Sequence, residues 1–457
     1  MGGPAVSEAV IVGGGLAGLA LAIGLRNIGI DAQVYEARDY ISGGEGTGIT
    51  LYPNGLRALN RIDPGILSQL CSRGVPDPTC LFLTPFGHCL SRWDLSTNMT
   101  ARYGFPMLAI GWREVQDVLF RMVPKDAIHT GHRLVAISQN EEAEGGSRGD
   151  GTVKCVFRKV SGGKECLLEV ETPLLLGADG IFSETRKHLL GEGVEPRDNR
   201  RTIWRAIIDS SAASHPLLQP RQGLTILAGD RSGFIMHGHA NKLYWGLMLA
   251  DGADPTVSSS RSSCGEEAKE KILRALKGWD VLPRIVEATP PECIVERRIL
   301  DMPSLPFWIK GRTALLGDAA HAVTPELGHG ANLAFEDAAQ MVECIRAHSD
   351  VRCALESFQS LRMPRLHAMA AKNDALVKAL YLDTQADNVN GSSQRTRSGV
   401  APVIRGAITT LLAAVTERRD TFDSLYAHDT VEVEDHVTHT NIVGCLDFLV
   451  LDEVGRS

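Results

Sequence analysis

Short apolar runs lie on both sides of the central part of the chain, at residues 9–12, 174–176 and 313–316. The first run, at residues 9–12, is short and rich in β-branched residues, as is typical of a buried parallel strand. A stretch of small and apolar residues with helical length follows, and a second strand is predicted to end on Glu36. Similar runs at 174–176 and 313–316 predict further buried strands, each followed by a turn that contains glycine.

The middle of the chain has a different pattern, in which short runs follow one another closely. Strands of an antiparallel sheet are predicted at residues 202–208, 224–228, 234–239 and 243–249, with a helix from about 266 to 278. Alternation along the last strand places Tyr244, Gly246 and Met248 on one face and Leu243, Trp245 and Leu247 on the other. The alternation does not tell which face meets a ligand.

The turn after the first strand carries a nucleotide-binding pattern. Gly13, Gly15 and Gly18 fit G-x-G-x-x-G: the first turns the chain, the second lets a pyrophosphate approach the backbone, and the third lets the helix pack on the strand. The helix N-terminus would direct its N–H groups at the pyrophosphate. Glu36 follows about 20 residues on, where a carboxylate can bind the ribose hydroxyls. The sequence therefore predicts a dinucleotide site for FAD or NAD rather than NADP.

Composition narrows the function classes. The formal net charge is −8 and the pI is near 6.0, without a basic run, which argues against a nucleic-acid surface. The ten cysteines are scattered without a C-x-x-C pair, so we expect reduced thiols and no metal site. The apolar stretch at 400–415 is too short to span a bilayer. We expect a soluble, cytoplasmic protein without an integral membrane anchor.

A cluster of glycines lies at residues 43–48, before a helix that Pro53 and Asn54 are predicted to begin. The cluster does not connect a strand to a helix, so it is not a second nucleotide loop. Two interpretations stay open: a plain surface linker, or a mobile wall of an active site.

Three motifs together resemble those of the group A flavoprotein monooxygenases, the single-component FAD-dependent aromatic hydroxylases related to para-hydroxybenzoate hydroxylase. The first is the glycine loop with Glu36. The others are Ala178-Asp179-Gly180 with Ser183 and Arg186, and Gly317-Asp318-Ala-Ala-His321 with Pro325. They occur in the family's order, and the resemblance covers roughly residues 7–370.

The resemblance implies roles for particular residues. It places Asp318 on the ribityl hydroxyls of FAD, the loop at 328–332 beside N1 and O2 of the flavin ring, and Asp179 and Arg186 at the nucleotide end. The full set of cofactor-binding positions is Gly13, Gly15, Ala17, Gly18, Glu36, Gly48, Arg113, Asp179, Arg186, Asp318, Gly330, Ala331 and Asn332. The catalytic candidates are Pro325, through its backbone carbonyl, and Arg205.

Some positions depart from the family pattern or leave alternatives open. Arg113 lies one position out of register with the family's cofactor-binding arginine, and Trp112 stands at the expected place. Arg205 either lies over the flavin or is a surface arginine on a sheet edge. His329 occupies a position where many relatives carry glutamine.

The activity implied by the resemblance is an NADH- or NADPH-dependent monooxygenation. The enzyme would use O₂ to hydroxylate or epoxidise a small aromatic, polycyclic or terpenoid-like substrate through a flavin C4a-hydroperoxide, as in secondary metabolism, and act as a monomer or homodimer. Two rivals stay open. One is a flavin-dependent reductase or dehydrogenase acting on a C=C or C–N bond, and the other is a non-enzymatic GTPase-regulator-like protein, against which Asp318 counts.

The expected fold is α/β, with a doubly wound, Rossmann-like FAD-binding domain and an inserted antiparallel β-sheet domain. The chain of 457 residues is too long for a single core. We expect the FAD-binding domain at 1–72, 111–190 and 290–370, and the substrate-binding sheet domain at 73–110 and 191–289. A helical C-terminal extension is expected at 371–457, with a polar linker at 385–398.

Overall fold

The structure is a computed structural model, and it describes residues 5–41, 47–76, 79–94, 98–139, 151–161, 164–228, 230–252 and 265–381. The chain divides into two compact units. The first comprises residues 1–74, 110–200 and 298–376, and the second comprises 75–109, 201–297 and 377–457. Most of the glycine cluster at 43–48, the expected linker at 385–398 and the apolar stretch at 400–415 lie outside the described residues.

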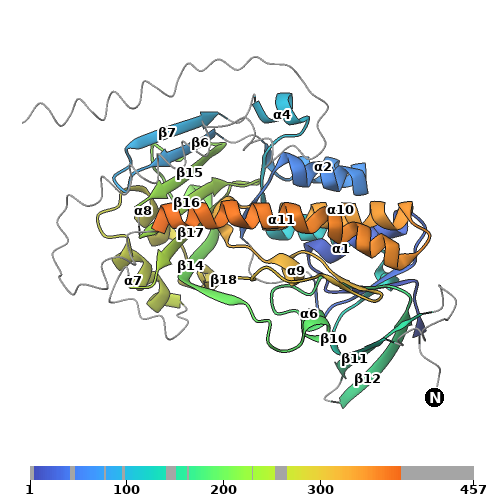
Figure 1. The fold of residues 1–457 in the computed structure, drawn as a ribbon. Helices are drawn as coiled ribbons and strands as arrows, with labels where there is room; N and C mark the ends of the chain where they lie inside the picture. Colours follow the sequence, from blue (N-terminus) through green and yellow to red (C-terminus); the bar gives the residue numbers. More distant parts are fainter. Residues whose placement is uncertain are drawn as a thin grey trace, which may run out of the picture. The chain divides into compact units, whose positions relative to one another are not determined.

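The first unit contains a six-stranded sheet. Figure 1 shows the fold of the chain, with several helices of this unit labelled. Its strands, in spatial order, are β19 (Ile309–Lys310), β20 (Thr313–Leu315), β13 (Leu175–Gly177), β2 (Ala9–Val12), β3 (Ala32–Tyr35) and β9 (Ile128–His129). All neighbours pair in parallel except β19, which is antiparallel to β20. Strands β2, β13 and β20 are completely buried, as their continuous apolar runs predict.

The first unit also contains eight α-helices among its described residues. They are α1 (Leu16–Asn27), α2 (Pro53–Ile62), α3 (Pro64–Cys71), α5 (Trp112–Met122), α6 (Glu184–Leu190), α9 (Asp318–His321), α10 (Gly330–Ala347) and α11 (Val351–Tyr381). Helix α1 lies close against α10, since a Cβ atom on Gly24 would lie 2.6 Å from Val342 Cγ2. The sequence from the glycine loop at 328–332 onward predicts helical character to about residue 382. The structure divides this stretch into α10 and α11, where Asp350 accepts a hydrogen bond from the Arg352 N–H and caps the start of the second helix.

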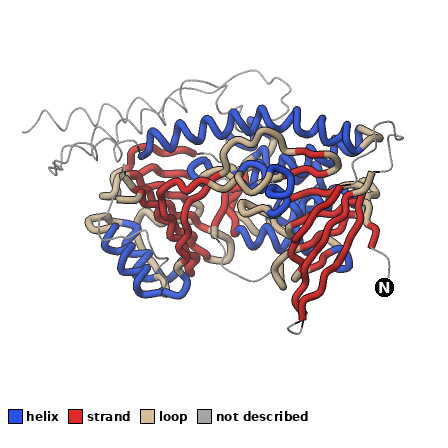
Figure 2. Tube along the Cα trace, turned by 60° about the horizontal axis from the view of Figure 1, so that its bottom comes forward, coloured by secondary structure: helices blue, strands red, loops and turns tan. Residues whose placement is uncertain are grey.

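A second, smaller sheet also belongs to the first unit, and it appears as a set of red strands near the N-terminus in Figure 2. Its order is β1 (Ala5–Val6), β12 (Lys164–Thr172), β11 (Val153–Ser161) and β10 (His132–Gln139). The polar run at 141–151 predicts a turn between two strands. The flanking strands β10 and β11 do pair in an antiparallel way, while residues 140–150 lie outside the described part.

The second unit contains a seven-stranded sheet with the order β18-β14-β17-β16-β15-β6-β7. Its strands are β18 (Val295–Asp301), β14 (Arg197–Asp209), β17 (Lys242–Ala250), β16 (Arg231–His237), β15 (Gln222–Leu227), β6 (Thr79–Leu83) and β7 (Cys89–Asp94). The predicted antiparallel strands are present, but β15 and β6 pair in parallel. A strand's partner is a nonlocal choice that its own pattern does not specify.

One face of this sheet is the core of the second unit. Leu243, Trp245 and Leu247 are at most 1% exposed and pack with apolar residues of α7 (Gly265–Ala275) and α8 (Val281–Ala288). The sheet face that packs against α7 and α8 is covered, so it cannot bind a ligand. The candidate ligand face is therefore the one that carries Tyr244 and Gly246.

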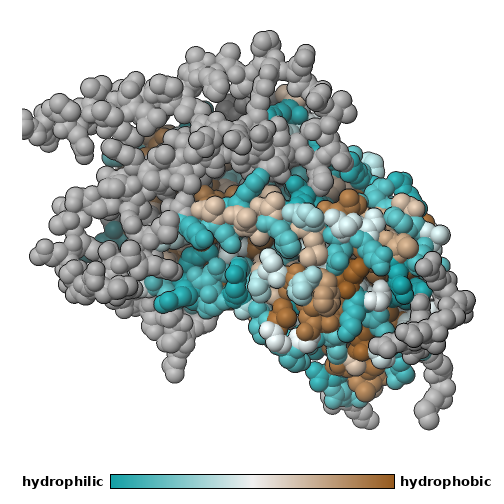
Figure 3. All heavy atoms as spheres, viewed as in Figure 1, coloured by the Kyte–Doolittle hydropathy of each residue, from teal (hydrophilic) through white to brown (hydrophobic). Residues whose placement is uncertain are grey.

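The surface of the first unit mixes apolar and polar side chains, as brown and teal spheres show in Figure 3. Scattered apolar residues are normal on protein surfaces. Among the helices in the described part of the chain, none combines the length and apolar character needed to cross a membrane.

Candidate active site

The glycines of the nucleotide loop have distinct surroundings. Gly13 has φ +106°, and a Cβ atom there would lie 2.3 Å from the Ala178 carbonyl oxygen. A Cβ atom on Gly18 would lie 2.0 Å from the Gly13 carbonyl oxygen. A Cβ atom on Gly15, in contrast, would have no neighbour within 4 Å. Gly13 and Gly18 thus shape the loop, and Gly15 leaves open space at the start of α1, as a close-approaching pyrophosphate requires.

Glu36 follows β3 and holds the same loop. Its Oε2 accepts a hydrogen bond from the Gly14 N–H at 2.7 Å, and its Oε1 accepts one from the Arg38 N–H at 2.9 Å. Each carboxylate oxygen can accept a second hydrogen bond. The contacts to the loop are therefore compatible with simultaneous binding of ribose hydroxyls.

Helix α5 adds a residue that sequence reasoning missed. The buried Gln116 side chain donates to the Gly14 carbonyl oxygen at 3.1 Å. Arg113 lies three positions earlier, and its buried Nε has no hydrogen-bond partner among the described residues. Residues three apart on a helix lie on the same face. The spacing of Arg113 and Gln116 could therefore have indicated that Gln116 lies on the same face of the helix as the predicted cofactor-binding residue Arg113. An unpartnered guanidinium N–H fits a site for an anionic group.

The second motif, at residues 178–186, forms a capped turn between β13 and α6. Asp179 accepts hydrogen bonds from Ser183 Oγ at 2.5 Å, from the Thr185 N–H and from Thr185 Oγ1. The Arg186 guanidinium is buried and donates to the carbonyl oxygens of Ile181, Val194 and Ala319. Both side chains thus serve the turn itself, and a contact of either with the cofactor stays a prediction.

The third motif follows β20. Gly317 has φ +57°, and a Cβ atom there would lie 3.3 Å from the Cβ atoms of both Ala17 and Ala334. Ala17 thus lies against this turn at the start of α1. Asp318 has solvent-exposed surface. The protein atoms around its carboxyl group nevertheless desolvate it, and this desolvation is the main cause that raises its pKa. The nearby Asp337 raises this pKa further, and His321 opposes the shift.

The three motifs meet at one edge of the sheet. They follow the carboxyl ends of β2, β13 and β20, which are neighbours in the order β20-β13-β2 and pair in parallel. Open α/β sheets bind ligands outside the carboxyl ends of their strands. The hydrogen-bonding groups at this edge fit FAD. The donors are the backbone at the start of α1, where Gly15 leaves open space, and the Arg113 Nε–H, which has no partner among the described residues. The acceptors are the carboxylates of Glu36 and Asp318.

The glycine loop before α10 is fixed by Asn332. Its Oδ1 accepts from the Tyr52 N–H at 2.8 Å, and its Nδ2 donates to the carbonyl oxygens of Thr50 and Gly328 at 3.0 and 3.2 Å. The loop is thereby joined to β4 (Gly48–Leu51), which begins at the predicted residue Gly48. Both Nδ2 hydrogens of Asn332 are used within the protein, while its Oδ1 keeps a second lone pair. A contact of Asn332, Gly330 or Ala331 with the cofactor stays a prediction.

His329 precedes α10 and is buried against Tyr52, with ring centroids 4.6 Å apart. Its Nδ1 lies 2.6 Å from the Leu327 carbonyl oxygen, which assigns the proton to Nδ1. Burial is the main cause that lowers the pKa of His329 to about 4. The ring is therefore neutral near pH 7.

Pro325 begins the 3₁₀ turn η4 (Pro325–Leu327), and its carbonyl oxygen accepts a hydrogen bond from the Gly328 N–H at 2.9 Å. The preceding Thr324 is buried and accepts a hydrogen bond on Oγ1 from Asn373 of α11 at 2.6 Å. A role of the Pro325 carbonyl toward a substrate would use its second lone pair.

Arg205 belongs to the second unit. It lies on β14 opposite Gly246 and is half-buried, on the sheet face that the core does not use. Phe234 shares this face, since a Cβ atom on Gly246 would lie 2.3 Å from its ring. Arg205 is thus not a fully exposed edge residue, and its role toward the flavin stays a prediction.

Comparison with known proteins shows which family the chain belongs to. The family model described as "FAD binding domain" matches residues 6–372. The aurachin C monooxygenase/isomerase of Stigmatella aurantiaca is 29% identical over 364 residues, which cover 79% of this chain and 86% of the relative. An FAD-dependent urate hydroxylase of Mycolicibacterium vanbaalenii is 28% identical over 367 residues, which cover 78% of this chain and 85% of the relative.

Solved structures share the fold. Klebsiella pneumoniae HpxO complexed with FAD and uric acid superposes with a TM-score of 0.74 at 22% sequence identity, covering 92% of this chain and 97% of that one. The predicted α/β fold with a doubly wound FAD-binding domain is thus confirmed. The chain belongs to the FAD binding domain family and, within it, to the FAD-dependent group A monooxygenases.

Proposed function

We propose that the protein uses NADH or NADPH and O₂ to hydroxylate or epoxidise a small organic substrate. The observation that carries the proposal is the meeting of three motifs at the carboxyl ends of β2, β13 and β20. FAD bound there supplies the redox chemistry and the reaction with O₂. The protein supplies binding, orientation and exclusion of water.

Particular residues would hold the cofactor. The α1 N-terminus beside Gly15, together with the Arg113 guanidinium, suits the pyrophosphate because both offer N–H donors to an anion. Glu36 suits the ribose, and Asp318 suits the ribityl hydroxyls. The backbone N–H groups that open α10 suit a ring system that gains negative charge on reduction.

An aromatic or polycyclic substrate is the class we favour. The curated relatives include enzymes named for urate, for 3-amino-4-hydroxybenzoate and for 6-methylsalicylate, all of which contain rings. In this chain, the candidate ligand face of the second unit carries Phe234 and Tyr244 beside Arg205. Aromatic side chains bind planar rings, and an arginine can donate to a ring oxygen.

The reductant needs a separate place. In the described part of the chain, a glycine loop that joins a strand to a helix and fits G-x-G-x-x-G occurs at residues 13–18. In the proposed arrangement FAD occupies this loop. We therefore propose that NADH or NADPH binds briefly at the protein surface and not in a second glycine loop of this type.

The placement of FAD is tested by Asp318→Ala. This change removes a charged acceptor, and hydrogen bonds to charged groups are worth about 1.5–3 kcal/mol each. FAD affinity should therefore fall by about tenfold to a hundredfold in a fluorescence titration of the apoprotein. The exposed Glu192, changed to Ala, serves as the control and should bind FAD like the wild type. Unchanged affinity in Asp318→Ala would show that Asp318 does not contact the cofactor.

A further inference from the structure

A fully buried carboxylate lies next to the Gly317–Asp318 turn. Asp337, on α10, is 0% exposed and accepts hydrogen bonds from three donors in two segments of the chain. The donors are the Gly317 N–H at 2.9 Å, His321 Nε2 at 2.5 Å and Arg362 Nε at 2.8 Å. Burial alone would raise the pKa of Asp337, but the His321 ring, the Arg362 guanidinium and these hydrogen bonds lower it overall. Asp337 is therefore an ionised, fully hydrogen-bonded group.

Two of these donors lie on either side of Asp318. Gly317 precedes Asp318 directly, and His321 ends the single turn of α9 that Asp318 begins. The Gly317 carbonyl oxygen also accepts the N–H groups of Ala320 and His321, both at 2.9 Å. The segment that presents Asp318 is thus tied at both ends to one side chain.

The third donor fixes that side chain in turn. Arg362 lies on α11 and is 1% exposed. Its Nε bonds Asp337, its Nη1 bonds Glu336 at 2.7 Å, and its Nη2 donates to the Leu333 carbonyl oxygen at 3.3 Å. Buried charged networks of this kind hold a single geometry because any lost partner leaves a desolvated charge.

We propose that Asp337 is a positioning residue for the cofactor, which sets the Gly317–Asp318 turn so that the Asp318 carboxylate meets the ribityl hydroxyls of FAD. The inference rests on the proposed placement of FAD and deepens it. Asp337 is 0% exposed, and the proposed role needs no contact between Asp337 and the cofactor. Asp337 acts through the Gly317 N–H and the His321 ring.

Geometry and charge make opposite predictions for the loss of Asp337. The Asp337 charge raises the pKa of Asp318, so its removal favours the ionised form of Asp318 that accepts hydrogen bonds. An electrostatic role alone would therefore leave FAD binding intact or improve it. Weaker binding in Asp337→Asn would point to the lost geometry.

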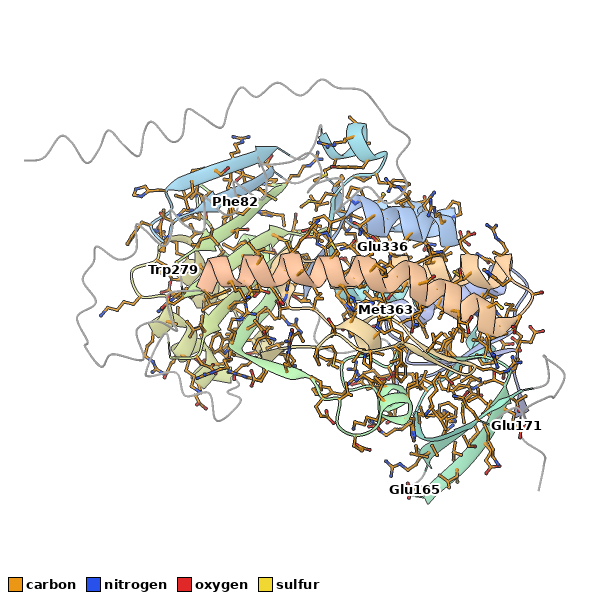
Figure 4. All side chains as sticks on the ribbon, in the orientation of Figure 1. Phe82, Glu165, Glu171, Trp279, Glu336 and Met363 are labelled. Atoms are coloured by element: carbon orange, nitrogen blue, oxygen red, sulfur yellow. The ribbon has the colours of Figure 1, made fainter. Side chains whose placement is uncertain are left out.

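Glu336 offers a matched control. It precedes Asp337 on α10, is also buried and shares Arg362 (Figure 4 labels Glu336). Its remaining contacts are with Arg365 at 2.5–2.6 Å and with Asn54 at 2.7 Å. In the hydrogen bonds of the described residues, it meets neither Gly317 nor His321.

The experiment compares Asp337→Asn with Glu336→Gln in the full chain. FAD dissociation constants are measured by fluorescence titration of each apoprotein, and thermal unfolding is followed without FAD. Both variants should unfold at lower temperature, but FAD binding should weaken about tenfold or more only in Asp337→Asn. Wild-type affinity in Asp337→Asn, or an equal loss in both variants, would overturn the proposal.

His321 provides a second pair of variants in case Asp337→Asn does not fold. A glutamine at this position can still donate to Asp337, whereas a leucine cannot. His321→Gln should therefore retain most of the FAD affinity, and His321→Leu should weaken it about tenfold. Equal affinities in the two variants would contradict the positioning role. If Asp318→Ala binds FAD like the wild type, the proposed placement of FAD is wrong. If Asp318→Ala loses FAD affinity while Asp337→Asn keeps it, the placement of FAD stands and the positioning role of Asp337 is wrong.

Discussion

Single glycines in the nucleotide loop are subject to different physical constraints. Gly13 combines a positive φ with a close approach to the Ala178 carbonyl, so any Cβ atom there is strained in the folded chain. Gly15 has an ordinary extended conformation as the N-cap of α1, and open space lies in its Cβ direction. The fold thus requires a glycine at position 13, and we predict that only the bound cofactor requires one at position 15.

Substitutions at these two positions should separate folding from binding. Gly13→Ala should lower the unfolding temperature of the apoprotein, because its Cβ atom would collide with backbone. Gly15→Val should cost the apoprotein only about 1 kcal/mol as an N-cap change, yet weaken FAD binding about tenfold or more. Calorimetry of the apoproteins and FAD titration measure both effects. A Gly15→Val protein that binds FAD normally would show that the pyrophosphate does not approach this loop.

Residue types in the motifs were visible in the sequence, but their partners were not. Asp179, Arg186 and Asn332 are predicted to bind the cofactor, which stays a prediction, and the structure shows their side chains bonded within the protein. Gln116 and Asn373 were missed because each bonds a residue far away in the chain. Contacts of this kind depend on packing between elements, which one sequence does not display.

Elements with a local signature were predicted well. The strands β2 and β3 and the helix α1 were expected from β-branched runs, glycines and helix length, and β20 from its short apolar run. The parallel pairing of β15 with β6 was not expected, and neither was the division of one helical stretch into α10 and α11. The first depends on distant partners, and the second depends on a single cap at Asp350.

The turn η4 and the start of α10 should give the protein a sensitivity to acid. His329 has a pKa of about 4 in the folded protein and about 6.5 in the unfolded chain. The unfolded chain therefore binds a proton first, and stability is lost as pH falls from about 6.5 toward 4. At pH 5 the loss from this group is about 2 kcal/mol.

His329→Gln should remove this part of the acid sensitivity. Denaturant unfolding of the apoproteins at pH 7 and pH 5 measures it, and the wild type should lose about 2 kcal/mol more than the variant. The carboxylates Glu336 and Asp337, whose pKa values are lowered, lose their contribution at more acidic pH and affect both proteins alike. An equal loss in both proteins would mean that His329 is not a buried neutral histidine.

The whole molecule could be assigned to a family because its three motifs are short, ordered in the chain and brought together by a parallel sheet. The substrate could not be assigned, since the residues proposed to face it come from a sheet whose register and core-covered face became visible only in the structure. The core-covered face carries Leu243, Trp245 and Leu247, and the other face carries Arg205, Phe234 and Tyr244. Family membership and the site chemistry then support oxygen transfer as the activity.

The fate of molecular oxygen tests the central claim most directly. Ring compounds are first screened for those that accelerate NADH or NADPH oxidation by the FAD-loaded protein, and the best compound is then converted under ¹⁸O₂. Mass spectrometry should show one ¹⁸O atom in each product molecule, with one NADH or NADPH consumed per product when the reaction is fully coupled. A product that is reduced or dehydrogenated and carries no ¹⁸O would contradict the monooxygenase and identify a flavin-dependent reductase or dehydrogenase.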